Sequence, residues 1–193
     1  MIKRQTLCDN EWLSLKIMKA PELGIDGYVY SHEERCNGNI VAILPYRFSD
    51  KGIEYLLRHE VTPCWHPTDK IISCITGGVD HKLEGKSFYD ELYNTIIEEV
   101  EQEAGYIITA KRTHYLGISF GTKSTDTIYH LIAVDLTGLE KTGDAKGDGS
   151  ELEEQAYCEW YDEIGSAQEP FVYMLFYKFN KYFNWASVGL DNG

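Results

Sequence analysis

The sequence predicts an α/β fold in which mixed strands and two helices form a sandwich. Three observations lead to this prediction: several short β-branched runs bounded by turns, one long helical pattern mid-chain, and a second helical stretch near the end. Strands and helices do not alternate regularly, so a doubly wound parallel sheet is not expected. With 193 residues, of which 43% are hydrophobic, the chain is long enough to bury a full core.

Strands are expected wherever β-branched and aromatic residues cluster between turn-forming residues. By this criterion the strands fall at residues 11–18, 27–32, 39–45, 53–59, 71–76, 114–120, 127–135 and 156–161. The run at 39–45 is almost continuously apolar, which is typical of a strand buried on both faces. The glycine- and charge-rich segment 137–150 has few apolar residues and is expected to be a long exposed loop.

Helical spacing is clearest between Ser87 and Ala104, where apolar residues recur every four positions. Ser87 and Asp90 are both suitable N-caps, and Gly105 stands where a C-cap glycine belongs. A second helix is expected at 169–185, with an aromatic and aliphatic stripe that favours a packing face: Phe171, Leu175, Phe179 and Phe183.

The net charge and the residue composition of the chain exclude some classes of function. Thirty-one acidic residues against 18 basic ones give a net charge of −13, which disfavours nucleic acid as a partner. No apolar stretch is long enough to span a bilayer, and no apolar run follows the basic residues at the start, so neither a membrane span nor a secretory signal is expected. Five scattered cysteines without a Cys-x-x-Cys pair favour free thiols and a cytoplasmic location.

The central helix carries an acidic face. At about 100° per residue, Glu99, Gln102 and Glu103 share one stripe and Glu98 lies at its edge. Clustered carboxylates repel one another unless water, salt or a hard cation neutralises them, and Mg²⁺ or Mn²⁺ prefers such oxygen ligands. A solvated acidic surface is the alternative. The glycine pair Gly77-Gly78 upstream favours a metal site, because it lets a backbone carbonyl approach an ion.

These residues resemble the signature of the Nudix hydrolases, in which Gly-x5-Glu-x7 is followed by Arg-Glu-apolar-x-Glu-Glu-x-Gly-apolar. The second half corresponds to residues 98–106, EEVEQEAGY, and the first half to residues 78–84, GVDHKLE. Three differences stand out: Glu98 replaces the arginine, Gln102 replaces the first glutamate of the terminal pair, and the loop is six residues longer. The first glutamate position is therefore either Glu84 or, counted back from Gly105, Asp90.

The resemblance implies a Nudix-like α/β/α sandwich with a mixed sheet. The front of the chain is similar to the ADP-ribose pyrophosphatase branch, which implies an N-terminal β extension at residues 1–37 before a compact catalytic unit at 38–193. In such proteins a divalent cation bridges carboxylates and a diphosphate substrate. The implied metal ligands here are Gly77, Glu98, Glu99, Gln102 and Glu103, with Mg²⁺ as the ion and Mn²⁺ as the alternative.

Catalysis also needs a general base, and the acidic loop at 150–154 is a credible source. Glu151, Glu153 and Glu154 are the candidates, of which we favour Glu153; Glu99 and Glu103 complete the predicted catalytic set. Substitution of Glu103 by glutamine is expected to remove most turnover and to leave the thermal transition nearly unchanged.

Four residues are candidates for substrate binding. Arg47 and Arg58 close two early strands and could meet phosphates, although such arginines are more often members of surface ion pairs. Trp12 and Tyr28 could stack a base, although aromatic residues in so aromatic a chain are more often part of a core or its rim.

Three functional hypotheses follow. The first is a metal-dependent pyrophosphatase acting on ADP-ribose or a similar nucleoside diphosphate derivative. The second keeps the fold but exchanges the substrate for a nucleoside triphosphate, a dinucleotide or a nucleotide sugar. The third is a catalytically impaired module that binds a nucleotide or a protein, and Glu98 and Gln102 favour it. The resembled branch is commonly dimeric, so a homodimer is left open.

Overall fold

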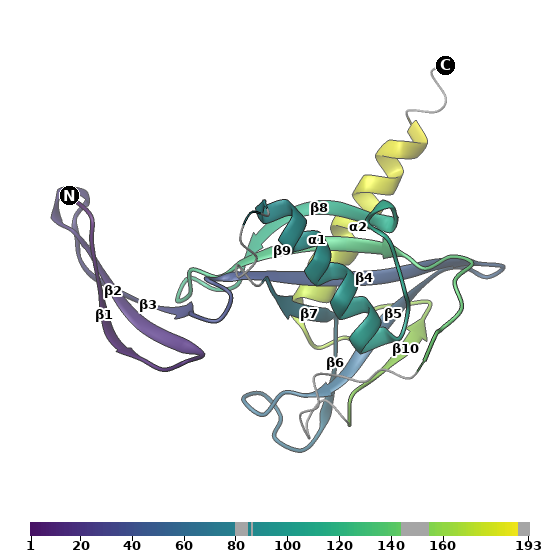
Figure 1. Ribbon diagram of the computed structural model, residues 1–193, viewed down its shortest axis with the longest axis horizontal. Helices are drawn as coiled ribbons and strands as arrows, with labels where there is room; N and C mark the ends of the chain where they lie inside the picture. The colour runs from purple at the N-terminus through teal and green to yellow at the C-terminus, as the bar shows by residue number, and fades with distance from the viewer. Residues whose placement is uncertain (80–84, 86, 144–154, 189–193) are drawn as a thin grey trace.

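The computed structural model describes residues 1–79, 85, 87–143 and 155–188, with side chains described as far as residue 183. Its first element is a three-stranded antiparallel sheet in the order β1-β2-β3, formed by β1 (Lys3–Asp9), β2 (Leu13–Ala20) and β3 (Ile25–Glu33). This sheet projects away from the rest of the molecule (Figure 1). It confirms the N-terminal β extension, whereas the division of the chain after residue 37 stays a prediction.

The second sheet is mixed, as predicted. Its main path runs β10-β5-β4-β9-β8, in which β4 and β9 are parallel and the other neighbours are antiparallel. The five strands on this path are β4 (Asn39–Ser49), β5 (Gly52–Val61), β8 (Thr113–Phe120), β9 (Ile128–Asp135) and β10 (Tyr157–Tyr161). Two short strands extend it: β6 (Lys70–Ser73) pairs with β5, and β7 (Ile75–Gly78) pairs with β4. The single strand expected at 71–76 is therefore two strands divided at Cys74.

The central helix begins and ends close to the predicted residues. In α1 (Phe88–Glu99) the Ser87 hydroxyl accepts from the Asp90 N–H, and the Asp90 carboxylate accepts from the Ser87 N–H, which completes a capping box. The helix then widens into a π-helical turn at Val100–Ala104 and stops at Gly105, whose φ of 75° is left-handed. Two short 3₁₀ turns, Pro21–Leu23 and Ala110–Arg112, precede β3 and β8.

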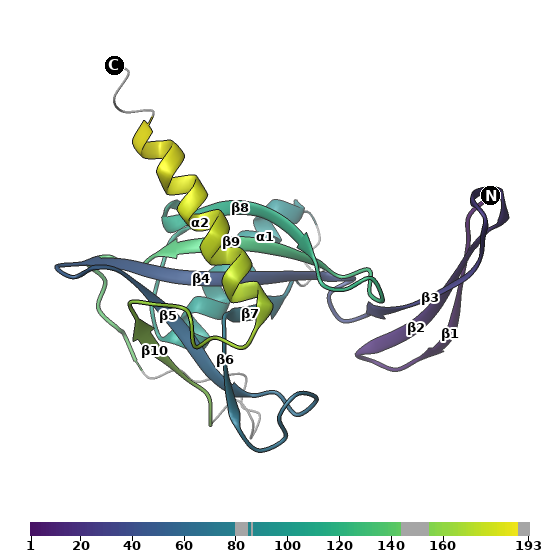
Figure 2. The same ribbon diagram turned by 180° about the vertical axis from the view of Figure 1, so that it is seen from behind.

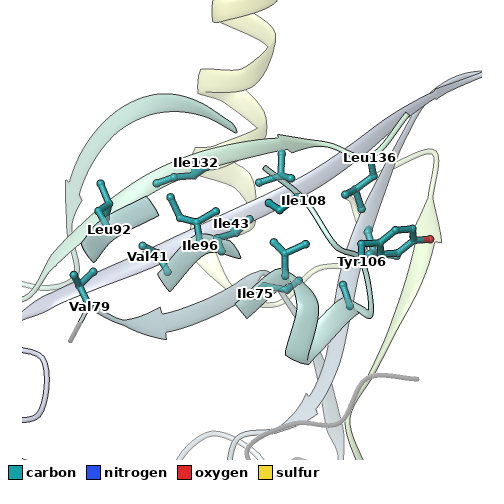
Figure 3. Packing of buried hydrophobic residues seen from close by; sticks show 14 residues of the cluster. Val41, Ile43, Ile75, Val79, Leu92, Ile96, Tyr106, Ile108, Ile132 and Leu136 are labelled. Atoms are coloured by element: carbon teal, nitrogen blue, oxygen red, sulfur yellow. The ribbon is translucent and has the colours of Figure 1, made fainter. Parts of the chain in front are cut away.

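The two helices cover opposite faces of the mixed sheet, which confirms the α/β/α sandwich. On one face α1 packs Leu92 and Ile96 against Val41 and Ile132 (Figure 3). Viewed from behind, α2 (Pro170–Val188) crosses the other face (Figure 2). Alternate residues of β4 and β9 face the two helices, so both central strands are buried on both sides.

The predicted stripe on α2 is a packing face. Leu175 and Phe179 are fully buried, Phe171 stacks on Tyr129, and Phe183 packs edge-on against Tyr46. No helix in the described ranges is both long enough and apolar enough to cross a membrane.

Glu169 is a buried carboxylate at the start of α2. It accepts a hydrogen bond from the Cys74 N–H (2.8 Å), at the break between β6 and β7. Burial raises the pKa of Glu169, and the nearby Glu60 charge raises it further. The folded protein therefore holds the Glu169 proton more tightly than the unfolded chain does. The stability that this group contributes is present below its unfolded pKa and is lost as the pH rises through the folded pKa.

We therefore expect Glu169→Gln, which keeps the accepting oxygen and removes the charge, to be more stable than the original protein at pH 7 and to lose that advantage toward pH 4. Thermal unfolding measured across this range tests the prediction. The exposed Glu163→Gln is the matched control. A difference in melting temperature between Glu169→Gln and the original protein that stays constant at all pH values would contradict the prediction.

Candidate functional site

The end of β7 and the end of α1 meet at Gly77. A Cβ atom at Gly77 would overlap the carboxylate and Cγ of Glu99, so this side chain lies directly against the glycine backbone. Gly77 pairs with Val41 in β4, which fixes the strand beneath the helix. Glycine is thus needed here for the close approach of Glu99, whereas the predicted approach of the Gly77 carbonyl to a metal ion stays a prediction.

Alanine at position 77 should displace the Glu99 carboxylate. If Glu99 acts in catalysis, this displacement is expected to lower turnover by about 10²-fold, because a shift of about 1 Å in a reacting group has effects of that size. The control is Gly165→Ala, since a Cβ there meets no atom within 4 Å. Steady-state rates for the two variants test the prediction; equal rates would show that the position of Glu99 does not matter.

Glu103 lies in the π-helical turn and forms an ion pair with Arg58 of β5. Both residues are buried, with 7% and 6% of their surfaces exposed, respectively. The Arg58 Nε atom also lies 3.2 Å from Glu60 Oε2, and Glu60 accepts a hydrogen bond from the Ser73 hydroxyl (2.7 Å). Arg58 therefore stands between two carboxylates and balances their charge inside the protein.

The π-helical turn separates residues that an ideal α-helix would align. Glu103 is buried, whereas Gln102 is exposed and lines a cavity of about 400 Å³ together with Glu98 and Glu101. Gln102 therefore leaves the single stripe of Glu99, Gln102 and Glu103 expected from 100° per residue, since a π-turn advances each residue by a smaller angle. A Cys158 thiol donates to the Glu103 carbonyl (3.4 Å), and burial raises the pKa of that thiol to about 11.

A divalent cation was predicted at this end of α1. The described ranges contain no group of three or more His, Cys, Asp or Glu side chains placed to hold a metal. Two carboxylates nevertheless have the right chemistry for a cation: Glu99 lies in the cradle left by Gly77, and Glu103 is buried with its Oε2 atom in the ion pair with Arg58. Hard carboxylate oxygens are the ligands that Mg²⁺ prefers, so the two side chains fit it as a partial ligand set.

Asp90 lies at the opposite end of the helix. Its carboxylate accepts from the Ser87 N–H (3.1 Å) and hydroxyl (2.8 Å). Nine residues of helix, roughly 13 Å at 1.5 Å per residue, separate it from Glu99. Asp90 is thus a helix-capping residue. The other candidate for the first glutamate position and the predicted bases lie outside the described residues: Glu84, Glu151, Glu153 and Glu154.

The remaining predicted binding residues are not in contact with these carboxylates. Arg47 pairs with Glu54 (2.8 Å) and lies over the Trp160 ring, 4.0 Å from its centroid. Trp12 and Tyr28 belong to the N-terminal part of the chain and are about half exposed. Of the four, the structure brings only Arg58 to the candidate site, and there it meets a carboxylate. Substrate binding by Arg47, Trp12 and Tyr28 stays a prediction.

Sequence reasoning missed Glu60 and Ser73 as parts of the site. One signal was present: Arg58 and Glu60 are two residues apart on a predicted strand, so their side chains share a face. Ser73 carried no such signal, because its place opposite Arg58 depends on the pairing of β5 with β6.

Comparisons with known proteins bear on the fold. No protein-family model matches the sequence, and no curated protein matches it. Among solved structures, an ADP compounds hydrolase superposes with a TM-score of 0.64 at 14% identity, covering 96% of this chain and 95% of that one. A protein from Listeria monocytogenes assigned to the Nudix hydrolases has a TM-score of 0.44 at 12% identity, covering 75% of this chain and 93% of that one. The first similarity extends over nearly the whole chain, which therefore has a Nudix-like fold.

Proposed function

We propose that this Nudix-like chain is a metal-dependent hydrolase that cleaves the diphosphate of ADP-ribose or of a similar nucleoside diphosphate derivative. The observation that carries the proposal is the placement of two glutamates near the end of the central helix: Glu99 is held against Gly77, and Glu103, in the following π-helical turn, is buried. Both glutamates stand at motif positions that the family resemblance assigns to metal ligands. The fold shared with an ADP compounds hydrolase supports a substrate of this class.

In this proposal Glu99 and Glu103 hold Mg²⁺, or alternatively Mn²⁺, and the resemblance adds the Gly77 carbonyl, Gln102 and Glu98. The bound cation would offset phosphate charge and lower the pKa of water. Arg58 holds the Glu103 carboxylate in a fixed position through their buried ion pair. Glu153, in the acidic loop, is proposed to accept the proton of the attacking water.

The substrate in this proposal is a small molecule and not a nucleic acid. With a net charge of −13, the chain repels long polyanions, whereas a cation held by carboxylates can bring in a single diphosphate.

One observation favours a second candidate, a module that binds a nucleotide and does not hydrolyse it. Arg58 neutralises Glu103 in their buried ion pair. If Arg58 outcompetes a metal for Glu103, ligand binding would persist without turnover.

A substrate panel distinguishes the two candidates. The purified protein is incubated with ADP-ribose, NADH, a nucleotide sugar and a nucleoside triphosphate, with Mg²⁺ or Mn²⁺, and release of nucleoside monophosphate is followed. We expect cleavage of ADP-ribose or a related diphosphate that EDTA abolishes and that Glu99→Gln lowers by at least about 10²-fold. Absence of cleavage, together with a ligand-induced rise in melting temperature, would support the binding module and contradict the hydrolase.

A further inference from the structure

The mixed sheet ends in an open edge at β8. Among the described residues, β8 pairs only with β9, and no main-chain group of another segment bonds to its outer side. The strand lies at the upper border of the body in both views (Figures 1 and 2). Its eight residues therefore present N–H and C=O groups with which a further strand can pair.

One irregularity interrupts this edge. The register with β9 shifts between Tyr115 and Gly117, so Leu116 is an extra residue without a partner in β9. The Leu116 carbonyl accepts a hydrogen bond from the Lys178 ammonium group of α2 (3.4 Å). A bulge and a lysine are features that discourage pairing between two copies of the same edge. They leave the strand open to a partner of the opposite charge.

The surface on the α2 side of β8 is basic. Residues 105–125 and 170–183, which include β8 and most of α2, contain no Asp or Glu, although the whole chain has 31 of them. Lys181 lies three residues after Lys178 and shares its side of the helix. Neither lysine forms an ion pair with a described carboxylate. In a chain of net charge −13, these two lysines favour an acidic partner.

The opposite side of β8, toward α1, is apolar. The His130 ring contacts Phe88 of α1, with ring centroids 5.2 Å apart, and marks this side of the sheet. The Tyr115 hydroxyl lies 3.2 Å from the His130 ring, and Ile118 is opposite His130 in the register. Phe120 follows Ile118 by two residues and shares its face. The three large side chains of β8 on this side are between 41% and 63% exposed.

We propose that the open edge of β8 binds an extended segment of another protein in which acidic and apolar residues alternate. The main chain of this segment would pair with β8. Because the side chains of a strand alternate between two faces, its acidic residues would meet Lys178 and Lys181, and its apolar residues would cover Ile118 and Phe120.

A second copy of this chain does not fit the same edge. Antiparallel pairing of two β8 strands would bring the lysines of both copies together, and β8 itself contains no acidic residue to offset them. The surface is also separate from the candidate site, because Gly77, Glu99, Glu103 and Arg58 lie on neither β8 nor α2. The proposal therefore does not depend on the proposed hydrolysis.

Fluorescence anisotropy with a labelled eight-residue peptide of alternating glutamate and valine tests the proposal. Three peptides of the same length serve as controls: one carries lysine in place of glutamate, one carries its four glutamates before its four valines, and one carries proline in place of the two central valines. We expect the alternating glutamate–valine peptide to bind at least about tenfold more tightly than each control. Proline weakens binding because it has no N–H to donate to the β8 edge.

Charge reversal on α2 tests the basic side. Lys178→Glu/Lys181→Glu should weaken binding of the glutamate–valine peptide by about tenfold or more, and the exposed Lys181→Glu alone should weaken it in the same direction. The matched control is Lys3→Glu/Lys19→Glu, which makes the same change of net charge at two exposed cross-strand neighbours of the N-terminal sheet. This control should bind the peptide almost as tightly as the original protein.

Phe120→Ala tests the apolar side and should also weaken binding of the peptide. Its control is Leu23→Ala, since Leu23 is an equally exposed apolar residue outside β8. Hydrogen exchange then locates the peptide, which should slow the exchange of the β8 amides.

Four results would overturn the proposal. The first is absence of binding by the glutamate–valine peptide, and the second is equal binding of the proline peptide, which would show that no strand is added. Equal weakening by Lys3→Glu/Lys19→Glu would show only a general charge effect. Protection of the β8 amides that rises with protein concentration, without peptide, would identify a second copy as the occupant. Failure of the substrate panel with peptide binding intact would contradict the hydrolase and leave this proposal standing.

Discussion

Glutamine in place of Glu103 should lower turnover by about 10²–10³-fold and should also lower the melting temperature by about 5–10 °C. The first effect follows from the loss of a charged metal ligand. The second follows from burial, because Arg58 would lose the charged hydrogen bond to one of its two carboxylate partners inside the protein, at a cost of about 2–3 kcal/mol. Because of the buried ion pair, we now expect a lower melting temperature, whereas the sequence alone led us to expect an unchanged thermal transition.

Kinetics and calorimetry on the same samples separate these two effects. Glu99→Gln is partly exposed and should lose turnover with little change in melting temperature. Glu101→Gln is exposed on the same turn and should change neither quantity. A Glu103→Gln variant with the original melting temperature would show that the Arg58 pair contributes nothing to stability.

Methionine in place of Arg58 should destabilise the protein by about 3–5 kcal/mol, because Glu103 and Glu60 would keep their charges without the cation between them. The double variant Arg58→Met/Glu103→Met removes both buried charges and fills the space with apolar groups. It is expected to recover most of that loss, since such replacements are often neutral or stabilising.

Chemical denaturation of Arg58→Met, Glu103→Met and the double variant completes the cycle. Turnover of the double variant should stay as low as that of Glu103→Gln, which would separate the structural role of the pair from its role in catalysis. A double variant as unstable as the sum of the single ones would mean that the two residues do not interact.

The periodicity of apolar residues was sufficient to predict the helices and strands that bury such residues. The four-residue spacing of α1 and the apolar run of β4 were predicted because each packs against the core. β1 was missed, since every residue in Lys3–Asp9 is exposed and no apolar alternation marks it as a strand. Its formation depends on pairing with β2, which is a tertiary property.

The site was only partly predictable for a similar reason. The motif identified Glu99, Glu103 and the glycine pair, because these lie close together in local sequence. Neither the π-helical turn nor the partner of Glu103 could be derived from a helical wheel, since Arg58 comes from a strand 45 residues earlier. The sequence offered Arg58 as a phosphate ligand or as a member of a surface ion pair; in the described structure its ion pair is buried, and phosphate binding stays a prediction.

The N-terminal sheet is expected to unfold locally while the rest of the protein stays folded. Across its three strands only Ser14, Ala20 and Tyr30 are buried, so little apolar contact opposes its separation from the body. Amide protons of β1 and β2 should therefore exchange with solvent through a small, local unfolding step, whereas those of β4 and β9 should need global unfolding. A ligand that binds the folded sheet would slow the exchange of the β1 and β2 amides and leave that of the β4 and β9 amides almost unchanged.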